Sequence, residues 1–230
     1  MEKQSQSNDW EVALTGSSTR REFLQRTVAG AAIIGLPSVV SGCHVLGAAG
    51  KPKLDFGDDF GVLNYAYALE TLEAKFYQTI VMSPPRDLKP GEFEILRDIG
   101  AHEVQHRRFF KRALGVLRMK VPDIDLSSVD FTRRDSVLRQ ARTFEDTGVA
   151  AYNGAGNRLK LAEFLTIAGK IVSVEARHAA TVRDMIAPES RSFAGDDVVD
   201  DTGRDRALPP SEVLAMVQPF FKSRLIIAGL

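Results

Sequence analysis

The sequence predicts an all-α protein built around a bundle of four long helices. Four segments carry apolar residues at alternating steps of three and four, which places those residues in a stripe along one face of a helix. Proline, glycine and serine residues interrupt the chain between these segments. The longest interruption separates the second segment from the third, so we expect a long crossover there and short turns elsewhere. The predicted helices span residues 58–82, 90–118, 133–157 and 160–187.

Capping residues and prolines set the expected ends of the first two helices. Asp58 or Asp59 can accept a hydrogen bond from the first backbone amides of the first helix. The segment 83–85, Ser-Pro-Pro, ends that helix. Pro90 suits the first turn of the second helix, which we expect to continue to about Arg118.

The remaining segments complete the predicted domain. Residues 119–131 lack a helical stripe and are expected to form the crossover between the second and third helices. The bundle therefore occupies residues 58–187. Residues 188–230 are predicted to begin as an acidic, exposed loop and to continue as a short helix, which starts at Pro209–Glu212 and ends near Phe221.

One spacing of charged residues occurs twice. Glu103 precedes His106 by three residues, and Glu175 precedes His178 by three residues. On an α-helix this spacing puts both side chains on one face, one turn apart. The two pairs therefore form an internal repeat, with one copy on the second predicted helix and the other on the fourth.

Each of the other two predicted helices carries a glutamate that is followed by a tyrosine seven residues later. On the first helix these residues are Glu70 and Tyr77, and on the third they are Glu145 and Tyr152. Both glutamates fall within the apolar stripes of their helices, as do the repeated Glu and His pairs. A bundle that buries its stripes would therefore also bury these charged groups.

A bound cation would resolve the electrostatic conflict that this pattern creates. Each unpaired buried carboxylate costs several kcal/mol, whereas a metal ion keeps such groups ionised. The alternative is that the glutamates turn toward solvent or pair with basic residues, and that the histidines are ordinary core residues. Glu73 also lies in the first stripe. It is a second choice as a ligand because the third helix has Gly148 at the matching position.

These residues resemble the metal-binding motif of the ferritin-like superfamily, and rubrerythrin-type sites in particular. The stretches that carry the likeness are LETLEAKFY (69–77), AHEVQHRRFF (101–110), FEDTGVAAYNGA (144–155) and VSVEARHAA (172–180). The nearest resemblance is to the ferritin-like family of twin-arginine-exported bacterial proteins and plant desiccation-related proteins. It implies a ferritin-like four-helix bundle that binds two Fe ions, or two Mn ions, through Glu70, Glu103, His106, Glu145, Glu175 and His178.

The resemblance also implies a role for each ligand. Glu103 and Glu175 would bridge the two ions, and the other four ligands would each bind one ion. Carboxylate and imidazole ligands suit iron or manganese, and metal supply decides between them. Tyr77 and Tyr152 either hydrogen-bond the ligand carboxylates or act as core residues.

Three functions are compatible with this pattern. The first is an exported oxidoreductase that consumes peroxide or O₂, or oxidises Fe(II), in defence against oxidative stress. The second is a protein that binds metal without turnover. The third is a metal-free helical protein of the desiccation-related kind, with a structural role under stress.

Composition narrows the partners of the protein. The net charge is zero, with 30 basic and 30 acidic residues, so electrostatic capture of nucleic acid is not expected. Cys43 is the single cysteine, which excludes an intrachain disulfide and a four-cysteine iron centre. A peroxidase reaction would therefore take its electrons from another protein. Assembly into a homo-oligomer is compatible with the sequence.

Residues 1–43 resemble a twin-arginine signal peptide. Arg20 and Arg21 lie in the motif Ser18–Leu24, and a short apolar stretch follows at residues 28–40. That stretch is shorter than a membrane-spanning helix requires and suits the apolar region of a signal. The twin-arginine (Tat) translocase is therefore an expected partner during export.

The end of this signal resembles a lipobox. Residues 40–43, Val-Ser-Gly-Cys, predict that lipid is attached to Cys43 and anchors the mature protein to a membrane. The alternative is cleavage near residues 46–49, which would release a soluble protein. Residues 44–57 are small, polar and rich in glycine and are expected to be a tether. We expect a periplasmic or cell-envelope location.

Overall fold

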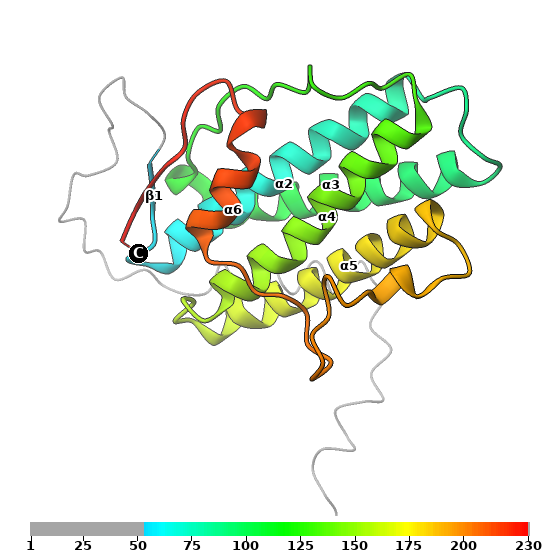
Figure 1. Cartoon of the computed structure of the whole chain (residues 1–230). Helices are drawn as coiled ribbons and strands as arrows, with labels where there is room; N and C mark the ends of the chain where they lie inside the picture. The colour runs from blue at the N-terminus through cyan, green and yellow to red at the C-terminus, as the bar shows by residue number, and fades with distance from the viewer. Residues whose placement is uncertain (1–52, 230) are drawn as a thin grey trace, which may run out of the picture. The chain divides into compact units, whose positions relative to one another are not determined.

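The computed structural model describes residues 53–229, which are mostly α-helical (Figure 1). Four long helices form a bundle: α2 (Asp59–Met82), α3 (Glu92–Leu114), α4 (Arg134–Gly156) and α5 (Ala162–Ile186). The predicted all-α fold is confirmed, with one helix for each predicted segment. Within residues 53–229, no helix combines the length and the apolar character needed to cross a membrane.

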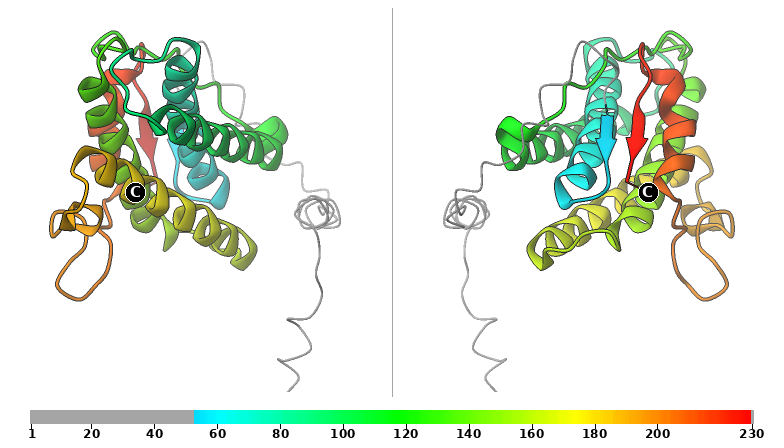
Figure 2. Two further views of the ribbon diagram at one scale, coloured as in Figure 1. Left: turned by 90° about the vertical axis from the view of Figure 1, so that its right-hand side faces the viewer. Right: turned by 90° about the vertical axis from the view of Figure 1, so that its left-hand side faces the viewer.

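The bundle consists of two helix pairs. α2 packs along α3, and α4 packs along α5, while α2 also contacts α4 (Figures 1 and 2). Residues 83–91 and 157–161 form the short connections within the pairs, whereas residues 115–133 pass from the first pair to the second. The crossover therefore lies where the sequence predicts it.

Asp58 caps the first helix of the bundle as predicted. Its carboxylate accepts a hydrogen bond from the backbone amide of Gly61 at 3.0 Å, which satisfies one of the free amides at the start of α2. At the other end, the backbone amide of Ser83 donates to the carbonyl of Thr79 at 3.1 Å. The two prolines that follow Ser83 prevent the helix from continuing.

Both ends of α3 differ from the prediction. The helix begins at Glu92 rather than near Pro90, because Gly91 precedes it with a φ of 86°. It ends at Leu114 rather than near Arg118, because Gly115 adopts a φ of 51° and a 3₁₀ turn, η2 (Gly115–Leu117), follows. Glycine tolerates positive φ at little cost, so a glycine at each end redirects the chain.

The C-terminal segment folds back onto the bundle. α6 (Pro210–Val217) contacts α4 and is followed by a 3₁₀ turn, η4 (Gln218–Phe220), close to the predicted end at Phe221. Beyond it, β2 (Ile226–Ala228) pairs in parallel with β1 (Lys53–Asp55) (Figure 2). This pairing was not predicted. Its three residue pairs are too short to produce a sequence pattern and join segments far apart in the chain.

The strand pair moves the start of the folded domain toward the N-terminus. Leu54 is fully buried and Phe56 is 5% exposed, although both lie in the segment that was expected to be a tether. The backbone amide of Phe56 also donates to the carbonyl of Ala228 at 2.8 Å. Residues 53–57 are therefore part of the packed domain rather than a solvated linker.

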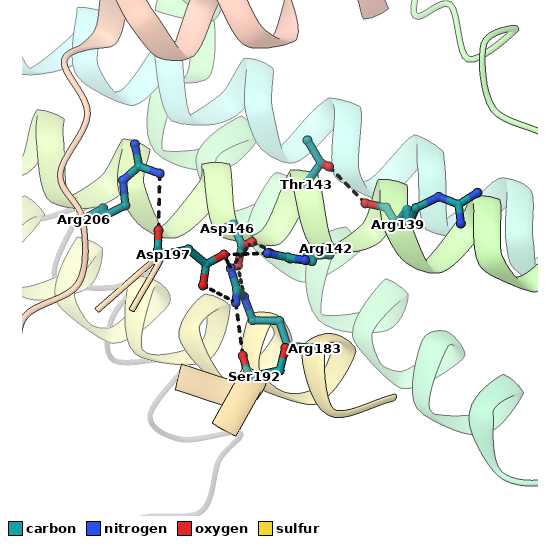
Figure 3. A network of polar contacts seen from close by, with 8 residues as sticks. All are labelled: Arg139, Arg142, Thr143, Asp146, Arg183, Ser192, Asp197 and Arg206. Atoms are coloured by element: carbon teal, nitrogen blue, oxygen red, sulfur yellow. Dashed lines mark hydrogen bonds and ion pairs between the residues drawn. The ribbon is translucent and has the colours of Figure 1, made fainter. Parts of the chain in front are cut away.

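The loop after α5 is held against the bundle by a network of ion pairs around Arg183 (Figure 3). Arg183 is only 2% exposed, and its guanidinium donates to both carboxylate oxygens of Asp146 at 2.8 and 2.7 Å. It also donates to Asp197 at 3.1 and 2.9 Å and to the carbonyl of Ser192, within the 3₁₀ turn η3 (Arg191–Ala194), at 3.1 Å. The predicted loop is largely exposed, but it is tied to both α4 and α5.

Candidate metal centre

The four long helices bring six ionisable side chains to one level inside the bundle. Their carboxylates and imidazoles come from every helix, and we call the set the carboxylate–histidine cluster. All four glutamates are fully buried, and His178 is 4% exposed. The side chain of His106 is 12% exposed. The members of the cluster are Glu70 on α2, Glu103 and His106 on α3, Glu145 on α4, and Glu175 and His178 on α5.

One half of the cluster surrounds His106. Its Nδ1 lies 2.8 Å from Glu175 Oε1, 3.4 Å from Glu70 Oε2 and 3.5 Å from Glu103 Oε2. Each of these four residues offers one ligand atom that lies within 4.8 Å of those of the other three. Helices α2, α3 and α5 thus supply three carboxylate oxygens and one nitrogen to a single small volume.

The other half of the cluster surrounds His178. Its Nδ1 lies 2.9 Å from Glu103 Oε1, 3.4 Å from Glu145 Oε2 and 3.7 Å from Glu175 Oε2. Each of these four residues also offers one ligand atom that lies within 4.8 Å of those of the other three. Glu103 and Glu175 therefore present one carboxylate oxygen to each half, whereas Glu70 and Glu145 each belong to one half.

None of these eight atoms, six carboxylate oxygens and two imidazole nitrogens, makes a hydrogen bond. Some nitrogen–oxygen distances are short, but the angles are not those of hydrogen bonds, and all eight atoms are buried. A buried polar atom without a partner costs about 1–3 kcal/mol, and more when it is charged. Eight such atoms at one level would be strongly destabilising for the protein alone. Buried carboxylate oxygens and imidazole nitrogens that lie close together without hydrogen bonds are an arrangement that a metal ion can complete.

The two tyrosines hydrogen-bond the outer carboxylates, and they do so across the bundle. The hydroxyl of Tyr77 on α2 donates to Glu145 Oε1 on α4 at 2.5 Å. The hydroxyl of Tyr152 on α4 donates to Glu70 Oε1 on α2. Each bond occupies the carboxylate oxygen that does not face the cluster, so the other oxygen is oriented inward. Burial, followed by the charge of Glu145, raises the pKa of Tyr77 well above its usual value, which keeps the hydroxyl a donor.

Burial and mutual charge strongly perturb the pKa values in the cluster. Burial opposes a charged imidazole, but the surrounding carboxylates raise the pKa of His178 to about 12 and that of His106 further. Burial also raises the pKa of Glu145 to about 7 and, together with the charge of Glu175, raises that of Glu103. Burial acts the same way on Glu175, yet the two histidines lower its pKa to about 2. In the absence of a cation, these shifts favour protonated imidazoles beside the carboxylates.

Glu73, the second choice as a ligand, lies beside the cluster but outside both halves. It is 4% exposed, and one of its oxygens is 3.1 Å from where a Cβ on Gly148 would stand. The absence of a side chain at Gly148 leaves the space that this carboxyl uses. Burial, followed by the charges of Glu175 and Glu103, raises the pKa of Glu73 well above its usual value. Glu73 is therefore a buried carboxyl next to the cluster whose surroundings disfavour its charged form.

Sequence reasoning missed His102, which hydrogen-bonds to His178. His102 Nδ1 lies 2.9 Å from His178 Nε2, the ring nitrogen that faces away from the cluster. The ring planes are 7° apart and the centroids are 5.2 Å apart, so the rings meet edge to edge in nearly one plane. His102 precedes Glu103 and therefore falls beside the apolar stripe rather than within it. A search for histidines flanking the stripe would have found it.

The remaining predicted sites, Arg20, Arg21 and Cys43, lie outside the described residues. The six predicted ligands, in contrast, all lie in one cluster whose donor set suits metal ions. Carboxylate oxygens and imidazole nitrogens are ligands for iron, manganese and zinc alike, so the donor set alone does not select one metal.

Comparison with known families agrees with the geometry. Residues 58–188, more than half of the chain, match the profile of the ferritin-like domain. The chain therefore belongs to the ferritin-like family, and the resemblance to that superfamily is confirmed. A search of curated proteins finds no match.

Proposed function

We propose that this protein binds two iron or manganese ions in the carboxylate–histidine cluster and uses them in redox chemistry. The observation that carries the proposal is the sorting of eight buried, unbonded donor atoms into two sets of four. Each set contains three carboxylate oxygens and one imidazole nitrogen. Two ions would neutralise four carboxylates that the protein otherwise balances only with protons.

The geometry supports one assignment of the ligands. Glu103 and Glu175 would be shared between the two ions because each presents one oxygen to either half. Glu70 would complete the half around His106, and Glu145 the half around His178. In this proposal Glu73 is a neighbour of the cluster rather than a ligand.

Other residues of the chain would hold these ligands in place. Tyr77 and Tyr152 restrict rotation of the two outer carboxylates through their hydrogen bonds. The apolar packing of the surrounding helices keeps bulk water away from the cluster and strengthens its electrostatic interactions. A bound pair of redox-active ions would supply electron transfer to or from peroxide, O₂ or Fe(II).

Elemental analysis of protein purified without chelator tests the metal site. We expect close to two Fe or Mn ions per chain, and we expect the double variant Glu103→Ala with Glu175→Ala to lose them. The matched control replaces two exposed glutamates on the same helices, Glu94→Ala with Glu163→Ala, and should keep its metal. Unchanged metal content in the first double variant would defeat the ligand assignment.

Turnover assays separate an enzyme from a metal-binding protein. If the loaded protein consumes peroxide, or oxidises Fe(II), over many equivalents, the oxidoreductase proposal is supported. Metal that stays bound without turnover would indicate a storage or structural role for the ions. A wild-type protein that takes up no metal would leave the metal-free, desiccation-related function, in which the bundle itself acts under stress.

We further propose that the chain is exported by the Tat translocase and anchored through lipid on Cys43. The support is the Arg20–Arg21 pair, the apolar stretch after it and the position of the single cysteine. In this proposal the protein resides in the periplasm or cell envelope. Replacing both arginines with lysine should retain the protein in the cytoplasm. Cys43→Ala should abolish labelling by a lipid precursor, whereas labelling that persists would exclude the anchor.

A further inference from the structure

The two halves of the carboxylate–histidine cluster differ in how their histidines are supported. The Nε2 of His178 is hydrogen-bonded to His102 Nδ1 at 2.9 Å. No residue that the structure describes makes the corresponding hydrogen bond to the outer nitrogen of His106. The cluster is therefore symmetric in its ligands but not in the contacts that orient them.

The internal repeat explains this difference. Glu103 and His106 on α3 correspond to Glu175 and His178 on α5, so His102 corresponds to Val174. Valine has no atom that can accept a hydrogen bond from an imidazole. His102, which precedes Glu103, thus provides a hydrogen-bond partner for His178. Val174, which precedes Glu175, provides none for His106.

The hydrogen bond selects one tautomer of His178. A nitrogen that binds a metal ion carries no proton, so His178 must carry its proton on Nε2 when Nδ1 serves as the ligand. His102 Nδ1 is the acceptor for that proton. The near-coplanar rings also restrict rotation of the His178 imidazole, so Nδ1 stays directed at Glu103 and Glu145.

We infer that His102 is a positioning residue that makes the two metal positions unequal, with tighter binding at the one formed by His178 and Glu145. This inference rests on the proposed function, because it assumes that the cluster binds metal. It goes beyond that function by assigning different affinities to the two halves and by naming the residue responsible. His102 itself does not belong to either set of donor atoms.

Titration of the metal-free protein with Co(II), followed by calorimetry and visible absorption, tests the inference. Wild type should bind in two distinguishable steps. His102→Leu removes the acceptor and should weaken one step by about 10- to 100-fold, as loss of a hydrogen bond to a metal-binding histidine usually does. His102→Asn keeps an acceptor near the position of Nδ1 and should restore most of the affinity. Gln105→Ala, an exposed change on the same helix, is the matched control.

Two ligand variants identify which position changes. Glu70→Ala leaves only the half around His178 complete, and Glu145→Ala leaves only the half around His106. Each variant also removes the partner of one tyrosine, so the two are matched. Adding His102→Leu should weaken Co(II) binding in the Glu70→Ala protein and leave the Glu145→Ala protein within about threefold.

The outcomes distinguish the inference from the proposed function. If wild type binds no Co(II), the proposed function fails and the inference fails with it. If wild type binds two ions and His102→Leu leaves both steps unchanged, or weakens both equally, the inference is overturned while metal binding stands. Failure of His102→Asn to restore the weakened step would also overturn it, because the effect would then not depend on the acceptor.

Discussion

Two groups of carboxylates differ in their burial, and the chain neutralises them in opposite ways: those around Arg183 are partly or largely exposed, and those of the carboxylate–histidine cluster are fully buried. Around Arg183, Asp146 and Asp197 accept hydrogen bonds from a guanidinium whose fixed charge and directed donors match them (Figure 3). In the carboxylate–histidine cluster, four glutamates meet only two imidazoles, and eight donor atoms lack hydrogen bonds. The first group is electrostatically complete in the protein alone, whereas the second is complete only with protons or a cation.

The contrast is sharpest on α4, where neighbouring residues belong to the two groups. Glu145 points into the bundle and is fully buried, while Asp146 faces the loop after α5 and bonds Arg183. Successive residues on an α-helix point about 100° apart, so a shift of one position along α4 moves a side chain from the bundle interior to the face that meets the loop. An acidic residue on a bundle helix therefore does not by itself indicate a metal site. What distinguishes the carboxylate–histidine cluster is that its carboxylates have no cationic partner with hydrogen-bond geometry.

Addition of a divalent ion should produce the largest difference between the two groups in their effect on the free energy of unfolding. If two ions each stand at about 100 times their dissociation constants, linkage raises the free energy of unfolding by about 5 kcal/mol in total. Urea unfolding with Mn(II) and with chelator measures this gain. The Asp146→Ala variant should show the same gain as wild type, and the Glu103→Ala with Glu175→Ala variant should show none. Coincident wild-type curves with and without Mn(II) would contradict the comparison.

Breaking the Arg183 network should destabilise the protein whether or not metal is bound. Asp146→Ala leaves a buried guanidinium without its bidentate partner and should lower the free energy of unfolding by about 3 kcal/mol. Denaturation in chelator and in Mn(II) should give the same loss. Asp184→Ala, an exposed change on α5, is the control and should stay within about 0.5 kcal/mol of wild type. A loss that appears only in chelator would mean that the two groups are coupled.

The pH dependence of stability should arise from the cluster and not from the network. The pKa of His178 rises to about 12 on folding, so its stabilising effect is complete below the unfolded value of about 6.5 and is lost as pH rises toward 12. The rise in the pKa of Glu145 to about 7 has the same sign between about pH 4.5 and 7. In contrast, the pKa of Asp197 falls to about 2 and that of Arg183 rises, so neither titrates near neutrality.

Unfolding in chelator between about pH 7 and pH 9 should therefore show stability falling by about 1.4 kcal/mol per pH unit for each histidine. Excess Mn(II) should remove this slope, because metal-bound imidazoles are neutral throughout. A flat profile in chelator would show that the histidines are not charged in the metal-free cluster. Asp146→Ala serves here as a control and should keep the wild-type slope.

The smallest expected effect concerns the two halves of the cluster itself. Val174→His places an imidazole at the position equivalent to His102 and should supply the missing partner for His106. We expect Co(II) binding at the weaker position to tighten by about three- to tenfold, with the stronger position unchanged. Val174→Ile is the control because it changes size without adding an acceptor. Equal tightening at both positions would contradict the asymmetry.

The local pattern of the chain was sufficient to predict the helices and the six clustered residues. Stripes with a 3.6-residue period are visible in a single segment, and so is the Glu103–His106 spacing with its repeat at Glu175–His178. The errors lie where local signals compete, as at the start of α3. Pro90 can begin a helix, but Gly91 after it adopts a φ of 86° and delays the start to Glu92.

The local pattern could not predict contacts between segments that are distant in the chain. The pairing of Lys53–Asp55 with Ile226–Ala228 and the bond from His102 to His178 each join residues far apart in the chain. The crossed bonds from Tyr77 to Glu145 and from Tyr152 to Glu70 do so as well. Sequence spacing showed that these tyrosines lie on the inner faces of their helices, but not which carboxylate each one meets.

By itself, then, the sequence determined that four amphipathic helices would carry a repeated set of acids and histidines on their inner faces, because helical periodicity is a local property. Only the tertiary structure decided how those groups are shared and supported. It gave Glu103 and Glu175 one oxygen for each half, placed Arg183 against Asp146, and supplied an imidazole hydrogen-bond partner to His178 but none among the described residues to the outer nitrogen of His106. These choices depend on how the helix pairs dock, which sets distances between atoms that no sequence spacing relates.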